Sequence, residues 1–463
     1  MTVQKRWFGA LLSVIGLLGL MGLTVVVVKA LCIISRPNVI LITVDALRAD
    51  HLGVYGYRRP TSPHLDQFAR DAIVFRHAYS HASATGPALG SLMTSHYPHE
   101  TQLLWNEKHT LQAGVVTLAE ILRARGYRTA AFVSNFTLRR SSGFEQGFDV
   151  YDDRMEDSST SAGGVQRIAP HVTQAAVNWL NDHYRERFFL WVHYMDPHGP
   201  YAPPPPYNTV FVQPPSKDMV LLPVHQTNSG RGGIPAYQQL GDHRDPDYYI
   251  AQYDGEIRFF DESFGTLLES ISTLGLLQHS LIIVTADHGE SLGEHHYYFT
   301  HPDFLYDGLL HVPLIVRFPG PCSPAKPIKY PVTHVDILPT ILERVSIKTA
   351  QPLRGVNLLK PKAREIFAET PVGGQKYALE WEGWKLILQQ PSSRFYDVHK
   401  NHSEQADLMG GNGMDEALAA HVAELQARLD AIRRLDALHL GHPLPLSADE
   451  EVGTQFRALG YLQ

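Results

Sequence analysis

Acidic and histidine residues directly follow three apolar stretches of this chain. Asp45 follows the run 38–44, and the pair Asp287 and His288 follows the run 281–286. A third stretch has the same form, with the run 188–194 followed by Asp196 and His198. Short, nearly continuous hydrophobic runs are typical of buried strands in a parallel sheet. Ligands of open α/β sheets bind at the carboxyl ends of the strands, so we expect these side chains to share one site. Aspartate and histidine together indicate a metal-assisted reaction on a charged substrate.

Predicted strands and helices alternate around these runs. The further elements that we expect are a helix from Pro63, a helix that follows a capping box at 117–120 and ends at Gly126, a strand at 129–134, a helix at 253–274 and a strand at 313–317. Alternation of this kind predicts an α/β fold built on a doubly wound, mostly parallel sheet.

Two regions depart from the alternation. Residues 202–246 are rich in proline and glycine and form a long irregular insertion, which is either an active-site lid or a passive surface excursion. The C-terminal part, residues 346–463, contains short strand candidates at 364–369, 384–388 and 394–398, and an apolar stripe at helical spacing between 418 and 432. These patterns predict a small α+β subdomain, which leaves residues 36–345 as the catalytic domain.

The first 35 residues differ in composition from the rest. Residues 7–28 carry no charge and span roughly 33 Å as a helix, which is enough to cross a bilayer. Lys5 and Arg6 precede this stretch, so the positive-inside rule predicts a cytoplasmic N-terminus and a catalytic body in the periplasm or outside the cell. A cleaved signal peptide is the alternative, but no small-x-small cleavage site follows. We therefore expect a single-pass membrane anchor at 1–35.

Bulk composition excludes some classes of site and partner. The net charge of −7 gives no electrostatic footprint for nucleic acid, so we expect no nucleic-acid partner. The two cysteines, Cys32 and Cys322, are too few for a thiolate metal site, and Cys32 lies at the predicted membrane edge.

The chain resembles the sulfatase branch of the alkaline-phosphatase superfamily over roughly residues 37–345. The resemblance rests on four motifs in this order, NVILITVDALRADHLGVYGY at 38–57, TGPALGSLMTSHYP at 85–98, DPHGPYAP at 196–203 and TADHGESLGE at 285–294. It implies an alkaline-phosphatase-like fold and an enzyme that hydrolyses sulfuric or phosphoric esters. It also implies that Asp45, Asp287 and His288 bind one metal ion, although Ala46 stands where many sulfatases have a second acid.

Thr85 marks a departure from the family. The usual signature is Cys or Ser, any residue, Pro, any residue, Arg, and its first residue is converted to formylglycine. Aligning Pro87 with the signature proline puts Thr85 at the nucleophile position and Leu89 at the arginine position. We expect no formylglycine here, because threonine is not a known precursor. Threonine is the nucleophile in related branches, where a metal lowers the pKa of the alcohol. Thr85 is thus expected to bind the metal and attack the substrate, unless it only caps the following helix.

Three further residues complete the expected site. His198 resembles the family histidine near the leaving-group oxygen, and His301 occupies the place of a family lysine or histidine. Either imidazole could bind the substrate oxyanion, protonate the leaving group or bind a second metal. His193 is a weaker candidate nearby. Asn135, at the end of the predicted strand 129–134, is expected to bind substrate.

These residues predict a metal-dependent hydrolase that cleaves sulfate or phosphate esters of a small molecule, glycan or lipid by in-line attack of Thr85. The metal could be Ca²⁺, Mg²⁺, Mn²⁺ or Zn²⁺, since the donor set mixes oxygen with nitrogen. Two alternatives stay open. One is a phosphoethanolamine-transferase-like enzyme that acts on a surface lipid or glycan, and the other is an inactive sulfatase-like binding module.

Overall fold

The computed structural model describes residues 36–106, 108–155, 166–214, 220–320, 326–400, 403–409, 415–435, 454–455 and 457–459. The predicted membrane helix lies within residues 1–35, outside the described residues, and stays a prediction. Within the described ranges, no helix is both long enough and apolar enough to cross a bilayer.

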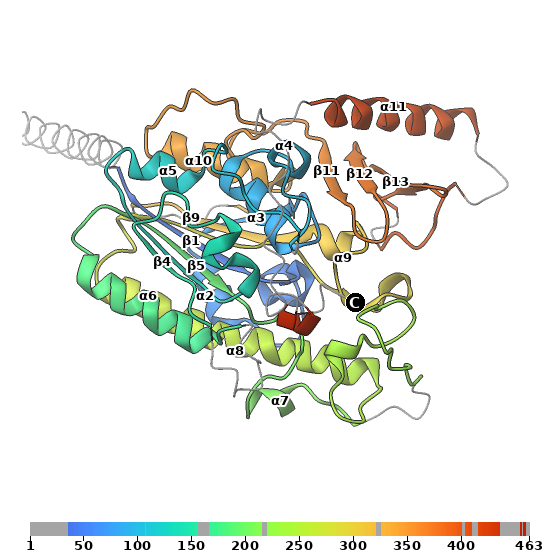
Figure 1. Cartoon of the computed structure of the whole chain (residues 1–463), viewed down its shortest axis with the longest axis horizontal. Helices are drawn as coiled ribbons and strands as arrows, with labels where there is room; N and C mark the ends of the chain where they lie inside the picture. The colour runs from blue at the N-terminus through green and yellow to red at the C-terminus, as the bar shows by residue number, and fades with distance from the viewer. Residues whose placement is uncertain are drawn as a thin grey trace, which may run out of the picture.

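An eight-stranded sheet forms the centre of the molecule (Figure 1). Its strands, in spatial order, are β10 (Val332–Thr333), β2 (Ile73–Tyr79), β9 (His311–Arg317), β6 (Ser280–Ala286), β1 (Asn38–Val44), β5 (Phe188–Tyr194), β3 (Arg128–Val133) and β4 (Val150–Asp152). Strand β9 runs antiparallel to both of its neighbours, and the other neighbouring pairs are parallel. The prediction of a mostly parallel sheet is confirmed.

Helices cover both faces of this sheet (Figure 1). One face carries α2 (Pro63–Ala69), α6 (Ala169–His183) and α8 (Pro246–Thr273), and the other carries α3 (Thr85–Thr94), α5 (Leu118–Arg123) and α10 (Ile337–Arg344). Every residue of β1, β5 and β6 is therefore buried, which explains why these strands are continuous apolar runs in the sequence. Shorter helices are α4 (Pro98–Thr101), α7 (Tyr207–Val210) and α9 (Asp307–Leu310).

Helix boundaries show where sequence signals were sufficient. The capping box before α5 is present, because the Thr117 side chain accepts from the Glu120 backbone and the Glu120 carboxylate accepts from Thr117. Helix α8 begins at Pro246, seven residues before the predicted start. Its N-cap, Asp245, accepts a hydrogen bond from the Asp247 N–H. That cap lies inside the proline-rich insertion, where the many turn-forming residues make the start of a helix hard to recognise in the sequence.

The insertion at 202–246 lies against α8 and the hairpin β7 (Ser291–Leu292) and β8 (Tyr298–Thr300). Helix α7 packs on α8 at Gly255, where a Cβ atom would lie 2.5 Å from the Tyr207 carbonyl oxygen. The Gln238 side chain donates to the Phe299 carbonyl at 3.1 Å and accepts from the Tyr201 N–H at 3.2 Å. The insertion is thus fastened to the segments that precede His301 and follow His198.

A second, antiparallel sheet forms the C-terminal subdomain. Its strands are β11 (Ile366–Thr370), β12 (Lys376–Trp381), β13 (Trp384–Gln389) and β14 (Arg394–Asp397), and α11 (Glu416–Arg433) packs on its outer face. Its inner face packs on the body of the protein around Tyr306, Leu309 and Leu310. Strand β12 was not predicted. Its first residue, Lys376, is fully buried and breaks the apolar pattern, and its ammonium donates to the Val372 carbonyl at 2.6 Å.

The packing of α11 on this sheet predicts that a cavity made in their interface lowers the stability of the protein. Leu429 is fully buried against the outer face, so Leu429→Ala should lower the free energy of unfolding by about 2–5 kcal/mol. Urea denaturation followed by circular dichroism measures this change. Ala423→Gln, at an exposed position of the same helix, is the control and should change stability by less than about 0.5 kcal/mol. Equal stability of Leu429→Ala and the parent would show that α11 does not pack as described.

Candidate active site

The carboxyl ends of β1, β5 and β6 bring predicted site residues to one edge of the sheet. Val44 pairs in register with Tyr194 of β5 and with Ala286 of β6. The Asp45 N–H donates to the Tyr194 carbonyl at 2.9 Å, and the Asp287 N–H donates to the Val44 carbonyl at 3.3 Å. These backbone registers hold the two aspartates next to each other.

Each of the two carboxylates has one oxygen that protein groups hold and one that they do not. Asp287 Oδ1 accepts the N–H of Ala46 at 3.1 Å and of His288 at 2.7 Å. Asp45 Oδ2 accepts from the Asn135 amide at 2.5 Å. Among the described residues, Asp45 Oδ1 and Asp287 Oδ2 have no hydrogen-bond partner, although both side chains are fully buried. Buried carboxylate oxygens in this state are strongly unfavourable unless a cation binds them.

His288 directs a ring nitrogen toward both carboxylates. Its Nε2 lies 3.7 Å from Asp45 Oδ1 and 3.6 Å from Asp287 Oδ2. Its Nδ1 lies 2.8 Å from the Gly289 carbonyl, which can only accept, so Nδ1 carries the proton in the neutral ring. Nε2 therefore presents its lone pair to the cluster, which is the form of histidine that binds a metal.

Thr85 is the first residue of α3, and its hydroxyl lies in the same cluster. Its Oγ1 is 3.5 Å from Asp45 Oδ2 and 3.5 Å from His288 Nε2. The alternative role as a helix cap is wrong, because Ala84 occupies the N-cap position, and the Gly86 N–H at the start of the helix donates to the Asn106 side chain at 2.7 Å. The N-terminus of α3 instead lies beside the hydroxyl, where the helix dipole favours a bound anion.

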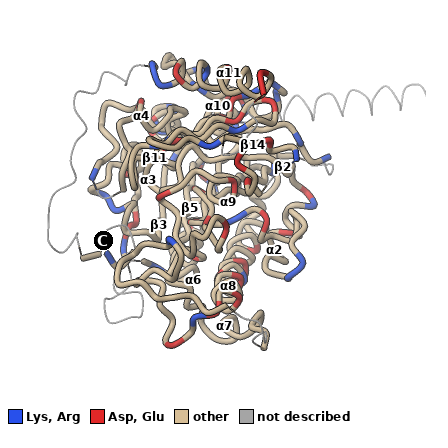
Figure 2. The backbone as a smooth tube through the Cα atoms, turned by 90° about the vertical axis from the view of Figure 1, so that its right-hand side faces the viewer, with Lys and Arg blue, Asp and Glu red and all other residues tan. Residues whose placement is uncertain are grey.

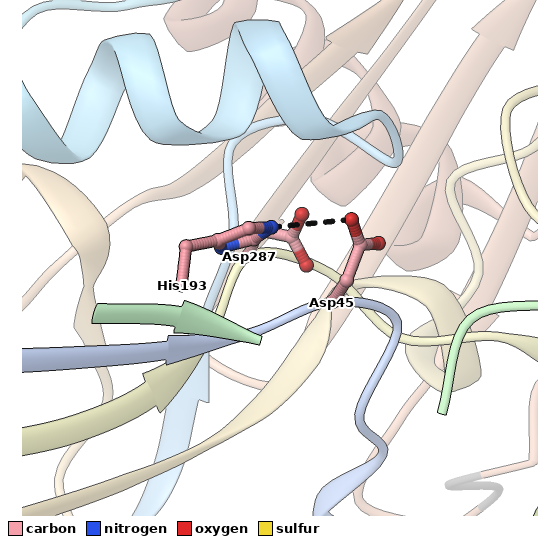
Figure 3. Close-up of side chains that lie close together, drawn as sticks. All are labelled: Asp45, His193 and Asp287. Carbon is pink, nitrogen blue, oxygen red and sulfur yellow. Dashed lines mark hydrogen bonds and ion pairs between the residues drawn. The ribbon is translucent and has the colours of Figure 1, made fainter. Parts of the chain in front are cut away.

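His193, which the sequence analysis gave as a weaker candidate, lies in the same cluster (Figure 3). Asp45, His193 and Asp287 each offer one ligand atom, and these atoms lie within 4.8 Å of one another. The His193 Nε2 is 3.4 Å from Asp45 Oδ2, while its Nδ1 is 2.8 Å from the Thr43 hydroxyl. Thr43 pairs in register with His193 across β1 and β5, so the two strands fix the orientation of the ring. This cross-strand pairing is the signal that would have identified His193.

Electrostatics of the pair point to a missing positive charge. Burial raises the pKa of Asp45, but His198, His193 and His288 outweigh burial and hold that pKa well below its usual range. Burial, and then the negative charge of Asp45, raise the pKa of Asp287 well above its usual range. Two adjacent buried carboxylates cannot both ionise without a cation between them.

The donor set fits a divalent metal ion. Ligand–metal distances of about 2.0–2.6 Å imply ligand–ligand distances of roughly 2.8–4.2 Å in octahedral or tetrahedral geometry. Thr85 Oγ1 lies 3.5 Å from both Asp45 Oδ2 and His288 Nε2, and His288 Nε2 lies 3.6–3.7 Å from the two carboxylates, so these distances fall in this range. Asp45, Thr85, Asp287 and His288 could therefore hold one ion, with His193 as a further ligand or as a partner of Asp45.

The two remaining predicted histidines lie beside this centre. The His301 ring lies 4.2 Å from that of His288 and 5.0 Å from that of His198, between centroids. Glu290, which the sequence analysis did not single out, lies 3.4 Å from His301 Nδ1. Burial lowers the pKa of His198 to about 4 and that of His301 well below its usual range, while it raises the pKa of Glu290 to about 7. His198 Nδ1 lies 2.8 Å from the Gly199 carbonyl, so its Nε2 is the acceptor atom at neutral pH.

Two other predicted positions have structural partners. Asn135 donates to Asp45, and its carbonyl oxygen accepts from the Thr137 N–H at 2.7 Å, so both ends of the amide have protein partners. Leu89, which the resemblance to sulfatases aligned with the signature arginine, is fully buried in the core around α3.

Comparison with known proteins is consistent with this geometry. A sequence model of the sulfatase family matches residues 37–347. An ulvan-active sulfatase of Formosa agariphila is 25% identical over 70% of this chain, and the alignment covers 64% of that relative. An N-acetylglucosamine-6-O-sulfatase of Bacteroides thetaiotaomicron is 24% identical, with 74% of each protein covered.

Solved structures show the same fold. The phosphonate monoester hydrolase of Agrobacterium radiobacter superposes with a TM-score of 0.69 and 20% identity, over 86% of this chain and 95% of that enzyme. The architecture is therefore the alkaline-phosphatase-like α/β fold of sulfatases, with a mixed sheet and a small C-terminal sheet.

The carboxylate pair predicts metal-dependent stability. A divalent ion at 100 times its Kd should raise the free energy of unfolding by about 2.7 kcal/mol. Asp287→Asn should abolish this increase, because it removes one of the two buried carboxylates. Denaturation with and without Ca²⁺, Mg²⁺, Mn²⁺ or Zn²⁺ measures the effect. Asp71→Asn, an exposed carboxylate, is the control and should keep the full increase.

The position of His193 predicts that the metal binds more weakly when this side chain is removed. His193→Ala should raise the Kd of the metal at least about tenfold, because the ring faces Asp45 and fixes the ligand arrangement. Isothermal titration calorimetry measures the Kd. His279→Ala removes an exposed histidine and should leave the Kd unchanged. An unchanged Kd in His193→Ala would remove His193 from the metal site.

Proposed function

The chain belongs to the sulfatase family of sulfuric ester hydrolases, and from that premise we propose that it cleaves sulfate or phosphate esters with Thr85 as its nucleophile. The observation that carries the proposal is the position of the Thr85 hydroxyl, 3.5 Å from both Asp45 and His288 at the N-terminus of α3. A divalent ion bound there would lower the pKa of this hydroxyl and offset the charge of the substrate anion.

The residues around Thr85 support an in-line displacement. The Thr85 hydroxyl donates to Asp45 Oδ2, which orients the oxygen for attack. Thr85 Oγ1 would form a bond to the sulfur or phosphorus atom as the bond to the ester oxygen breaks, and the alcohol would leave. Water would then cleave the covalent ester on Thr85 and release sulfate or phosphate. If another alcohol took the place of water, the same residues would catalyse group transfer.

His198 and His301 support the departure of the alcohol. In the described site both rings are neutral, because burial lowers the pKa of each. The arrival of an anionic substrate would raise both pKa values, since an opposite charge nearby favours the protonated imidazole. A protonated His198 Nε2 or His301 could then donate its proton to the leaving oxygen.

Substrate class and location extend the proposal. Two relatives described above are named as an ulvan-active sulfatase and an N-acetylglucosamine-6-O-sulfatase. We propose a sulfated or phosphorylated glycan, lipid or small molecule as the substrate. The uncharged stretch 7–28 supports a membrane-anchored enzyme with its catalytic domain outside the cytoplasm.

Replacing the nucleophile tests the mechanism. Thr85→Ala should lower kcat at least about 1000-fold, whereas Thr85→Ser, which keeps the hydroxyl, should lose far less. The assay uses 4-nitrophenyl sulfate, 4-nitrophenyl phosphate and bis(4-nitrophenyl) phosphate with each of the four metals. Thr94→Ala, a buried threonine at the other end of α3, is the control and should keep its activity.

Mass spectrometry of the quenched reaction provides a direct readout. A sulfated or phosphorylated Thr85 peptide would support covalent catalysis, and the substrate that forms it would decide between sulfur and phosphorus. Ester hydrolysis that survives Thr85→Ala would contradict the assignment of the nucleophile. No activity and no bound metal would support the inactive binding module.

A further inference from the structure

The candidate site is closed in this structure. The side chains of Asp45, Thr85 and His288 are fully buried, and those of His198 and His301 are at most 2% exposed. A substrate therefore reaches Thr85 only if some part of the surrounding protein moves.

The C-terminal end of the chain packs on two segments that adjoin this site. The described residues 454–455 and 457–459 form a short helical turn, in which the Leu459 N–H donates to the Gln455 carbonyl at 3.2 Å. This turn lies against the body of the protein and away from α11, the helix that precedes it in sequence (Figure 1). Figure 2 likewise shows the C-terminal end of the chain, marked C, away from α11. Leu459 is 1% exposed and packs with Met195 and Phe136.

Both residues under Leu459 belong to segments that build the site. Phe136 directly follows Asn135, whose amide donates to Asp45. Met195 lies between His193 and His198, and its carbonyl accepts the His198 N–H at 2.8 Å. The leucine thus packs on the two segments that carry Asn135 and His198.

A second contact fastens this turn to the insertion. The Asn228 amide donates to the Arg457 carbonyl at 3.2 Å, and its carbonyl oxygen accepts from the Tyr237 N–H at 3.3 Å. The Tyr237 hydroxyl donates to the Phe299 carbonyl at 3.0 Å, two residues before His301. The C-terminal turn and the insertion therefore meet on the same side of the site.

Among the described residues of the turn, Thr454, Arg457 and Ala458 are exposed, and Leu459 is the buried apolar residue. Burial of one leucine side chain shifts an equilibrium on the order of 10- to 100-fold, which a bound ligand can reverse. The flexible side chain of methionine can adapt to ligands of different shape. The Arg139 guanidinium stacks over the Phe136 ring, 4.3 Å from its centroid.

We propose that Phe136 and Met195 form an apolar subsite for the leaving group of the substrate, and that Leu459 occupies this subsite until the substrate displaces it. The proposal rests on the proposed function and narrows its substrate class to esters whose alcohol carries an apolar group, such as an aryl or alkyl chain. While Leu459 occupies the subsite, such a ligand cannot bind there. The apparent Kd therefore equals the intrinsic Kd divided by the fraction of molecules in which Leu459 is displaced.

Binding of two anions to the full chain tests the proposal without turnover. Phenylphosphonate carries an apolar group and has no ester bond, and inorganic phosphate is the matching anion without that group. Leu459→Asp should bind phenylphosphonate about tenfold more tightly than the parent in Mn²⁺, with an unchanged Kd for phosphate. Ala458→Asp places the same charge on the exposed neighbouring residue and should change neither Kd.

Hydrogen exchange gives a second readout. Amides of residues 134–138 and 195–198 should exchange faster in Leu459→Asp than in Ala458→Asp. The double variant Phe136→Ala with Leu459→Asp should bind phenylphosphonate no more tightly, relative to phosphate, than the parent does. If circular dichroism shows that Leu459→Asp does not fold, Leu459→Ala takes its place.

Three results would overturn the proposal. Unchanged exchange would show that Leu459 does not cover these segments. Equal tightening for both anions would show that Leu459 limits entry without occupying an apolar subsite, and unchanged affinity for both would show that it does neither. Absence of ester hydrolysis with the expected binding pattern would contradict the proposed function and leave the subsite in place.

Discussion

Two carboxylates buried at the ends of neighbouring parallel strands are the constraint on which the rest of the site depends. Backbone pairing between β1 and β6 places Asp45 and Asp287 side by side, and complete burial of both strands excludes the water that would solvate them. Protein groups partner only one oxygen of each carboxylate among the described residues. The fold accepts this arrangement because histidine rings and a helix N-terminus face the pair, and a divalent cation would complete it.

The sequence predicted this centre well where chemistry and strand ends coincide. Asp45, Asp287 and His288 each follow an apolar run, so strand topology alone brings them together. Thr85 follows no such run, and only the resemblance to sulfatases identified it. His193 was only a weaker candidate, because it lies inside a buried strand. A histidine there is hard to distinguish from a core residue unless its cross-strand partner, Thr43, is known.

The fold shows the same division between local and long-range signals. Buried strands and the capping box before α5 were predictable, because each depends on residues that are close in sequence. The start of α8 was not predictable, because it lies in a proline-rich segment. Strand β12 was not predictable either, because it begins with a buried lysine. Contact of Leu459 with Met195 joins residues that are far apart in the chain, and no local pattern encodes it.

Charge balance explains how a sulfatase-family site could work without the signature arginine. Leu89, which the sequence resemblance aligned with that arginine, is buried in the core, and His301 is buried with its ring 4.2 Å from that of His288. Burial lowers the pKa of His301, so neither position holds a fixed positive charge at neutral pH. Positive charge would come from a cation beside Asp45 and Asp287, and from protonation of His198 and His301 when an anion arrives. In that scheme, the histidine that binds the anion would also be the acid that protonates the departing alcohol.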